Sequence, residues 1–290
     1  MSLLMTLKWV IVLSVVLNAL ALAMRARAED VLYLVRRPGL ALRSFVSMYV
    51  VVPLVALLAV VVIDPCPGVV LALLVLSLSP VPPLLPKKQL KSGGEGAYIL
   101  GLLVSAAVAS VLVMPWGLSL LASLFGRELH IPPAGIIKTL IITIVGPMLL
   151  GWVLQKVLGA KAEPLSHVIG RIGMWLLVLG AVGVLVVLAP ALWRVVGGGT
   201  LLAMLVVIVA GLASGYLLGG TSPGIRTALA LASATRHPGV ALGVIGASVP
   251  EAKLAMVAVI IFVLLNVVVG IPFVKLARRR ASTGQRAPED

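Results

Sequence analysis

The stretch Leu231-Ala-Ser-Ala-Thr-Arg-His-Pro-Gly-Val-Ala-Leu242 interrupts an apolar segment that is long enough to cross a membrane. Its arginine costs about 3 kcal/mol or more at the bilayer centre. Pro238 removes a backbone donor and disfavours helical geometry at His237. Such a sequence is tolerated where the backbone lines a cavity or is covered by protein. We therefore predict a broken helix whose unwound middle, residues 233–240, forms part of a substrate site. The alternative is an inert kink in which neighbouring carbonyls hold Arg236.

The composition places the whole chain in a lipid bilayer. Of its 290 residues, 61% are hydrophobic and 11% are charged, and the mean hydropathy is +1.20. These values exclude a soluble domain and predict an all-α polytopic membrane protein. The net charge of +14 also fits a nucleic-acid partner, but the basic residues occur in short runs between apolar segments. That pattern is typical of the positive-inside rule, so we expect no nucleic-acid partner.

Counting apolar segments of about 20 residues predicts about nine transmembrane helices. We expect them near residues 5–24, 38–63, 67–88, 95–121, 133–157, 164–189, 196–219, 222–248 and 251–275. A short amphipathic stretch, 28–37, separates the first two. Residues 1–277 then form a single transmembrane domain, and the basic tail 278–290 is expected to be disordered.

The basic residues also predict an orientation. With the N-terminus outside, most of the 23 lysines and arginines lie at inner loops or inner helix ends. An odd number of spans puts the C-terminus in the cytoplasm. We therefore expect an integral protein of the plasma (inner) membrane. Residues 1–24 also look like a signal peptide, but Arg25 and Arg27 make a poor cleavage region, which favours a first transmembrane helix.

Two segments of the chain share a pattern of prolines that suggests an internal repeat. One opens with Pro67-Gly68 and breaks at Pro80, and the other opens with Pro223-Gly224 and breaks at Pro238. A glutamate follows each break and a late proline marks each next helix. The two segments are five spans apart, so they cross the membrane in opposite directions. Paired broken helices in inverted halves are typical of secondary transporters with a site near the midplane.

The chain resembles the bile acid:sodium symporter family over nearly its whole length. The resemblance rests on Leu34-Val-Arg-Arg-Pro-Gly39, on Ser79-Pro-Val-Pro-Pro-Leu-Leu-Pro-Lys-Lys88, and on Arg236-His-Pro-Gly-Val-Ala241. It implies a panel domain and a core domain, between which the substrate is carried by alternating access. Two discontinuous helices, 67–88 and 222–248, would cross in the core.

The chain departs from that family where the coupling ion binds. Sodium-coupled members carry a glutamate shortly before a Gln-Asn pair in the second crossing helix. Here Arg236-His237 stands in place of the pair and Ala232 in place of the glutamate. Sodium coupling through that site is therefore not expected. We predict that Arg236 is either a fixed internal cation or the ligand of a substrate carboxylate. A sodium- or proton-coupled symporter that uses backbone carbonyls and hydroxyls is the alternative.

We predict that the substrate is a small organic anion, a carboxylate, and that the residues around the two breaks bind it. For His237 the alternatives are proton coupling or plain hydrogen bonding. For the serines and threonine the alternative to substrate binding is a hydrogen bond back to their own helix, which is common in membrane helices. Asn18 is an additional candidate that serves equally well as a polar contact between helices. The predicted substrate-binding residues are Arg236, His237, Thr235, Ser233, Pro238, Gly239, Ser77, Ser79, Pro80, Pro82 and Asn18.

Other classes of protein fit the sequence less well. No paired intramembrane carboxylates and no nucleophile motif indicate an enzyme. Cys66 is the sole cysteine, which excludes a cysteine-based metal site and weakens an arsenite-type exporter. A non-transporting scaffold does not account for two broken helices. We predict neither a metal nor a cofactor, and the sequence indicates no oligomeric state.

Overall fold

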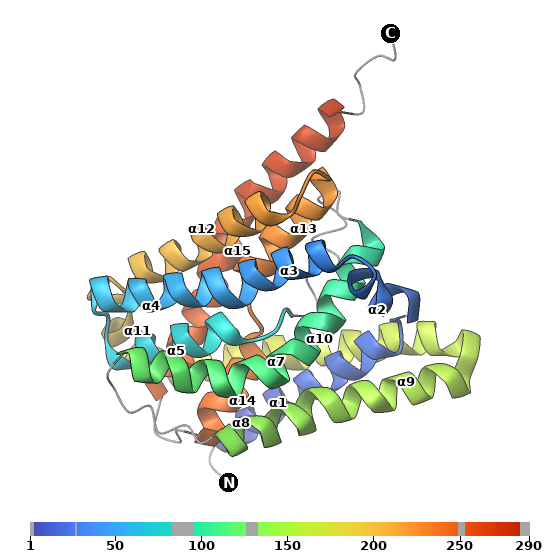
Figure 1. Ribbon diagram of the computed structural model, residues 1–290. Coiled ribbons are helices and arrows are strands. Elements are labelled where there is room, and N and C mark those ends of the chain that lie inside the picture. The colour runs from blue at the N-terminus through green and yellow to red at the C-terminus, as the bar shows by residue number, and fades with distance from the viewer. Residues whose placement is uncertain (1–2, 27, 83–94, 126–132, 249–252, 285–290) are drawn as a thin grey trace.

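The computed structural model describes residues 3–26, 28–82, 95–125, 133–248 and 253–284, and within them the chain is helical and has no strand (Figure 1). The elements are α1 (Leu3–Ala23), α2 (Ala28–Val35), α3 (Pro38–Val46), η1 (Ser47–Val51), α4 (Val52–Ile63), α5 (Pro67–Leu78), α7 (Gly96–Phe125), α8 (Pro133–Leu140), η2 (Ile141–Val145), α9 (Gly146–Leu158), η3 (Gly159–Lys161), α10 (Ala162–Val187), α11 (Ala189–Val196), α12 (Thr200–Leu218), α13 (Pro223–Ala234), α14 (Pro238–Ser248) and α15 (Lys253–Gly284). The predicted all-α fold is confirmed.

The helices account for the predicted membrane spans. In the described residues, 7 stretches are long and apolar enough to cross a bilayer. The longest, Pro133–Val187, holds two helical segments that reverse direction at Gly159, whose φ of 52° is left-handed (Figure 1). The shorter apolar helix α5 is the first half of a broken span. Helix α15 continues to Gly284, into the tail that is expected to be disordered, and residues 285–290 lie outside the described part of the chain. Alanine and arginine, which favour helix, fill much of this extension.

One layer of the molecule consists of α1, α8–η2–α9 and α10, and we call it the panel. Helix α1 packs against both α9 and α10, and Figure 1 shows α9 turning back into α10 beside it. Glycines permit this close approach. A Cβ at Gly151 would lie 2.5 Å from the Leu20 carbonyl oxygen, and one at Gly180 would lie 2.6 Å from the Ile11 side chain. The three helices therefore fit together as one tightly packed unit.

The remaining helices form a second layer, which we call the core. In it, α12 and α13 pack through glycines spaced four residues apart. A Cβ at Gly211, Gly215 or Gly219 would lie 2.4–2.8 Å from backbone atoms of α13. The seam places α13 directly against α12 and holds the end of α13, where the helix breaks, in a fixed position.

The two broken helices have matching first halves. Helices α5 and α13 each span 12 residues and begin with Pro–Gly. Proline suits the first turn of a helix, because the backbone N–H that it lacks would have no partner within the helix at that position. Each helix ends in extended backbone, at Ser79 with ψ 152° and at Thr235 with ψ 120°. The second break is shorter than the predicted residues 233–240, because α13 continues to Ala234 and the chain resumes helix at Pro238. The second half of the first broken helix, residues 83–88, lies outside the described part of the chain.

The panel touches the core where α1 and α8 pack against α14, and where α8 packs against α7. The Lys8 ammonium donates a hydrogen bond to the Gly246 carbonyl at 2.8 Å, near the end of α14. At the start of α14, the Val15 side chain covers Gly239 so closely that a Cβ there would lie 2.4 Å from it. One end of the interface between the two layers is thus closed by direct contact.

Candidate functional site

The two helix breaks meet at a point. The backbone amide of His237 donates to the Pro80 carbonyl at 2.9 Å and to the Ser79 hydroxyl at 3.2 Å. Pro80 and Pro82 have no N–H, so the first break has carbonyls in excess of donors. The second break, which leads into the N-terminus of α14, supplies a free amide. The predicted crossing of the broken helices is therefore found, and its backbone groups satisfy one another.

Arg236 lies at this crossing, and its side chain is only 1% exposed. Its Nη2 donates to the Met48 carbonyl at 2.6 Å, and its Nη1 donates to the Ser79 carbonyl at 3.2 Å. The ring of Tyr49 lies 6.0 Å from the guanidinium carbon. Carbonyl oxygens, not a carboxylate, thus surround the charge. The Nε atom has no hydrogen-bond partner among the described residues.

The Met48 carbonyl is free to accept this bond because of a π-helical turn. In η1 the amide of Val52 donates five residues back, to Ser47. The corresponding partner of Met48 is residue 53, which is a proline and has no N–H. The helix therefore cannot use the Met48 carbonyl, and Arg236 does. Single π-turns often occur at functional sites, and the Val52–Pro53 pair was the sequence signal for this one.

Thr235 joins the site to α15. Its hydroxyl donates to the Asn266 side-chain oxygen at 3.1 Å, and the Asn266 amide donates to the Ala234 carbonyl at 2.8 Å. Asn266 therefore binds a carbonyl that the break in helix α13 leaves free. The prediction missed this residue because nothing local distinguishes Asn266 from a polar contact between helices.

The serines divide into two groups. Ser233 belongs to a buried hydroxyl cluster, in which Ser47 lies 2.7 Å from Ser233 and 3.0 Å from Ser214. The hydroxyls of Ser77 and Ser79 donate back to their own helix, to the Leu74 and Leu76 carbonyls. Ser79 still accepts the amide of His237, so it remains part of the crossing.

His237 and Gly239 shape the start of α14. The His237 Nδ1 accepts from the Val240 amide at 3.4 Å and so caps the helix. Gly239 leaves room for Val15 of the panel. By contrast, Asn18 lies within the panel, where its amide donates to the Ser14 carbonyl at 2.7 Å and faces Gly173 of α10. Asn18 is thus separate from the other predicted residues.

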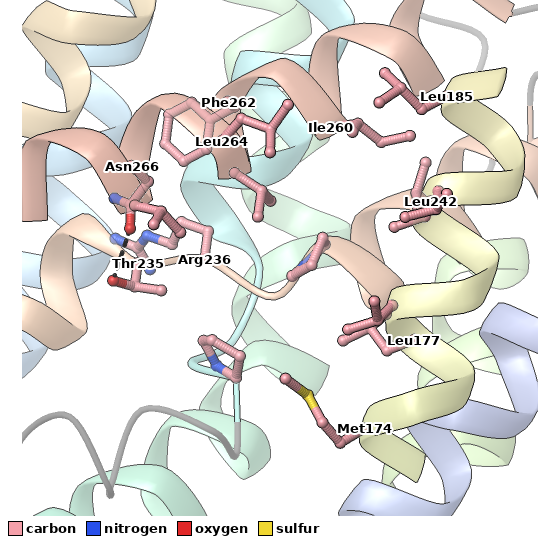
Figure 2. A pocket seen from close by; sticks show the side chains of 17 residues that line it. Met174, Leu177, Leu185, Thr235, Arg236, Leu242, Ile260, Phe262, Leu264 and Asn266 are labelled. Carbon is pink, nitrogen blue, oxygen red and sulfur yellow. Dashed lines mark hydrogen bonds between the residues drawn. The ribbon is translucent and has the colours of Figure 1, made fainter. Parts of the chain in front are cut away.

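A cavity of about 390 Å³ lies beside the crossing, between α10 of the panel and α15 of the core (Figure 2). Four predicted residues line it: Pro82, Thr235, Arg236 and Pro238. Asn266 adds an amide, while the rest of the wall is apolar and includes Met174 and Leu177 on one side and Ile260 and Leu264 on the other. The other predicted residues do not line this cavity. Within the described residues, no cluster of three or more His, Cys, Asp or Glu side chains could hold a metal.

A comparison with protein families bears on this geometry. The model of the family described as "Sodium Bile acid symporter family" matches residues 10–193, which is more than half of the chain. The chain belongs to the sodium bile acid symporter family. Its members are transporters, and the crossing of the two broken helices in the core, beside the panel, agrees with that assignment. The match ends before α12, so it does not include Arg236. A comparison with curated proteins gives no significant match.

Proposed function

We propose that the protein is a secondary transporter of a small organic anion, a carboxylate, and that it works by alternating access between the panel and the core. The observation that carries this proposal is the position of the cavity. Its walls come from both layers, and its floor is the crossing of the two broken helices. A rocking motion of one layer against the other would expose such a cavity to each side in turn.

The lining of the cavity suggests the kind of anion. Apolar side chains of α10 and α15 make up most of the wall, so the substrate carries an apolar body. Thr235, Asn266 and the arginine supply the polar groups at one end. An anion whose head points at the crossing would lie close to a buried positive charge.

Within this proposal, Arg236 is a fixed internal cation. Both of its Nη groups are held by backbone carbonyls, the type of ligand that transporters use to bind alkali cations at helix breaks. A sodium ion 4 Å away would be repelled by about 4 kcal/mol at an effective dielectric constant near 20. The guanidinium therefore takes the place of an inorganic cation, and transport does not need sodium. A substrate carboxylate would use the guanidinium N–H groups that these two carbonyls leave free, among them the Nε.

Uptake into proteoliposomes tests the proposal. Purified protein is first screened for carboxylates that raise its melting temperature, since a ligand that binds the folded state must stabilise it. Uptake of the best ligand is then compared in sodium and in potassium at equal ionic strength. Saturable uptake that is the same in both salts supports the proposal. Saturable binding without uptake would reject transport.

The second candidate is a sodium- or proton-coupled symporter, and the hydroxyl cluster of Ser47, Ser214 and Ser233 is the observation that favours it. These oxygens lie on three elements that meet next to the break. Uptake that requires sodium, or that follows an imposed proton gradient, would support this candidate instead. In both cases we propose a plasma-membrane location with the N-terminus outside.

A further inference from the structure

A second cavity, of about 410 Å³, lies between the panel and α7 of the core. All of its walls are apolar, and they come from α1, α2, α7, η2 and α9. The lining residues are Ala23, Ala26, Leu32, Val104, Val108, Ile144, Val145, Met148, Leu149 and Trp152. Water would find no polar partners there, so water is a poor occupant.

Several of the lining side chains also face outward. Val108 is 55% exposed, Leu149 is 58% exposed and Trp152 is 47% exposed. Since these residues belong to membrane-spanning stretches, the space outside them is the hydrocarbon of the bilayer. The cavity is therefore continuous with the region that lipid acyl chains occupy.

A positive charge lies at one end of this cavity. The Lys156 ammonium lies 4.5 Å from the centre of the Trp152 ring, one turn further along α9. Gln155 lies at the same end of α9. Its amide donates to the Ala26 carbonyl at 3.2 Å and so joins α9 to the end of α1. Aromatic rings and lysines in this arrangement are typical of the level of the lipid headgroups.

We propose that this cavity is a binding site for an anionic phospholipid, with one acyl chain between α7 and α9 and the headgroup phosphate at Lys156. The apolar walls match the chain, and the lysine matches the charge of the head. Because the walls belong to both the panel and the core, the bound lipid bridges the two layers. The proposal does not depend on the identity or the transport of the organic anion.

Fluorescence quenching by brominated lipids tests the site. Two single-tryptophan proteins are prepared by changing the other tryptophans to Phe, one retaining Trp152 and the other retaining Trp175, which is 62% exposed on α10 and serves as the control. Each is reconstituted in phosphatidylcholine with increasing amounts of phosphatidylglycerol that is brominated on one acyl chain. We expect half-maximal quenching of Trp152 at a mole fraction about fivefold lower than for Trp175, as one basic residue near the surface can provide.

Two variants separate the parts of the proposal. In Lys156→Gln, anionic and zwitterionic brominated lipids should quench Trp152 equally well. Val108→Phe fills the cavity, so in that variant neither lipid should quench Trp152 at a lower mole fraction than Trp175. Quenching of Trp152 and Trp175 at the same mole fraction would show ordinary boundary lipid and overturn the proposal. Equally strong quenching of Trp152 by a free brominated fatty acid would reject the phospholipid as the ligand.

Discussion

The amide of His237 and the carbonyl of Pro80 are 2.9 Å apart, although 156 residues separate them. This hydrogen bond fastens one broken helix to the other at the point where neither is helical. It also fixes the neighbouring residue, Arg236, so that its guanidinium reaches the Ser79 and Met48 carbonyls. The crossing is therefore a single hydrogen-bonded unit, and changes to any part of it should affect the rest.

Arg236→Ala should lower the melting temperature and abolish uptake of the organic anion. The change leaves the Met48 and Ser79 carbonyls buried without a partner, at a cost of about 1–3 kcal/mol each. Methylguanidinium, added to the purified variant, should restore part of the lost stability by refilling the space. The exposed Arg171 provides the control, because Arg171→Ala should change neither quantity. Stability of Arg236→Ala equal to that of the wild type would contradict the fixed-cation role.

Gly215→Ala should destabilise the core by about 3 kcal/mol. The added Cβ would lie 2.5 Å from the Ala230 Cα, and backbone in a tightly packed seam cannot move aside without cost. Thermal unfolding in detergent measures the effect. Gly39→Ala is the matched control, since a Cβ there meets no heavy atom within 4 Å. A melting temperature for Gly215→Ala that equals that of the control would argue against the α12–α13 seam.

Asn266→Ala should reduce uptake of the organic anion more than it reduces stability. It removes the donor to the Ala234 carbonyl and the acceptor for Thr235, so the break next to the cavity loses its link to α15. We expect a rise in the KM for the anion of about tenfold, equivalent to about 1.4 kcal/mol. Ser123→Ala, an exposed hydroxyl that bonds only to its own helix, should leave KM unchanged. An unaltered KM in Asn266→Ala would separate this residue from the site.

Lys8→Met should weaken the closed contact between α1 and α14. It keeps the apolar stem but loses the hydrogen bond to the Gly246 carbonyl. The readout is labelling of Val15→Cys by a membrane-impermeant maleimide in a Cys66→Ser background, because Val15 is buried against Gly239 when the contact is closed. We expect faster labelling in Lys8→Met and an unchanged rate in Lys8→Arg. Equal rates in Lys8→Met and the parent would mean that the lysine does not hold the contact.

Much of the fold could be predicted from local features of the sequence. Apolar length decided the membrane spans, and the Pro–Gly pairs at residues 67 and 223 decided where the broken helices begin, because proline fits a first turn whatever lies around it. Pro238 marked the second break for the same reason, and Arg236 marked it because a charged side chain is costly in hydrocarbon. These features act through the backbone of a few neighbouring residues, so a single sequence is enough to interpret them.

The partners of the site were decided by the tertiary structure. The sequence places Arg236 at a break, but the carbonyl of Met48 is available only because η1 packs beside the crossing with a proline at residue 53. Asn266 reaches the Ala234 carbonyl, and Lys8 reaches Gly246, across distances in sequence that no local pattern encodes. Hydrogen bonds to backbone carbonyls can be made by many polar side chains. Which side chain makes each bond depends on how the glycine seams bring the helices together.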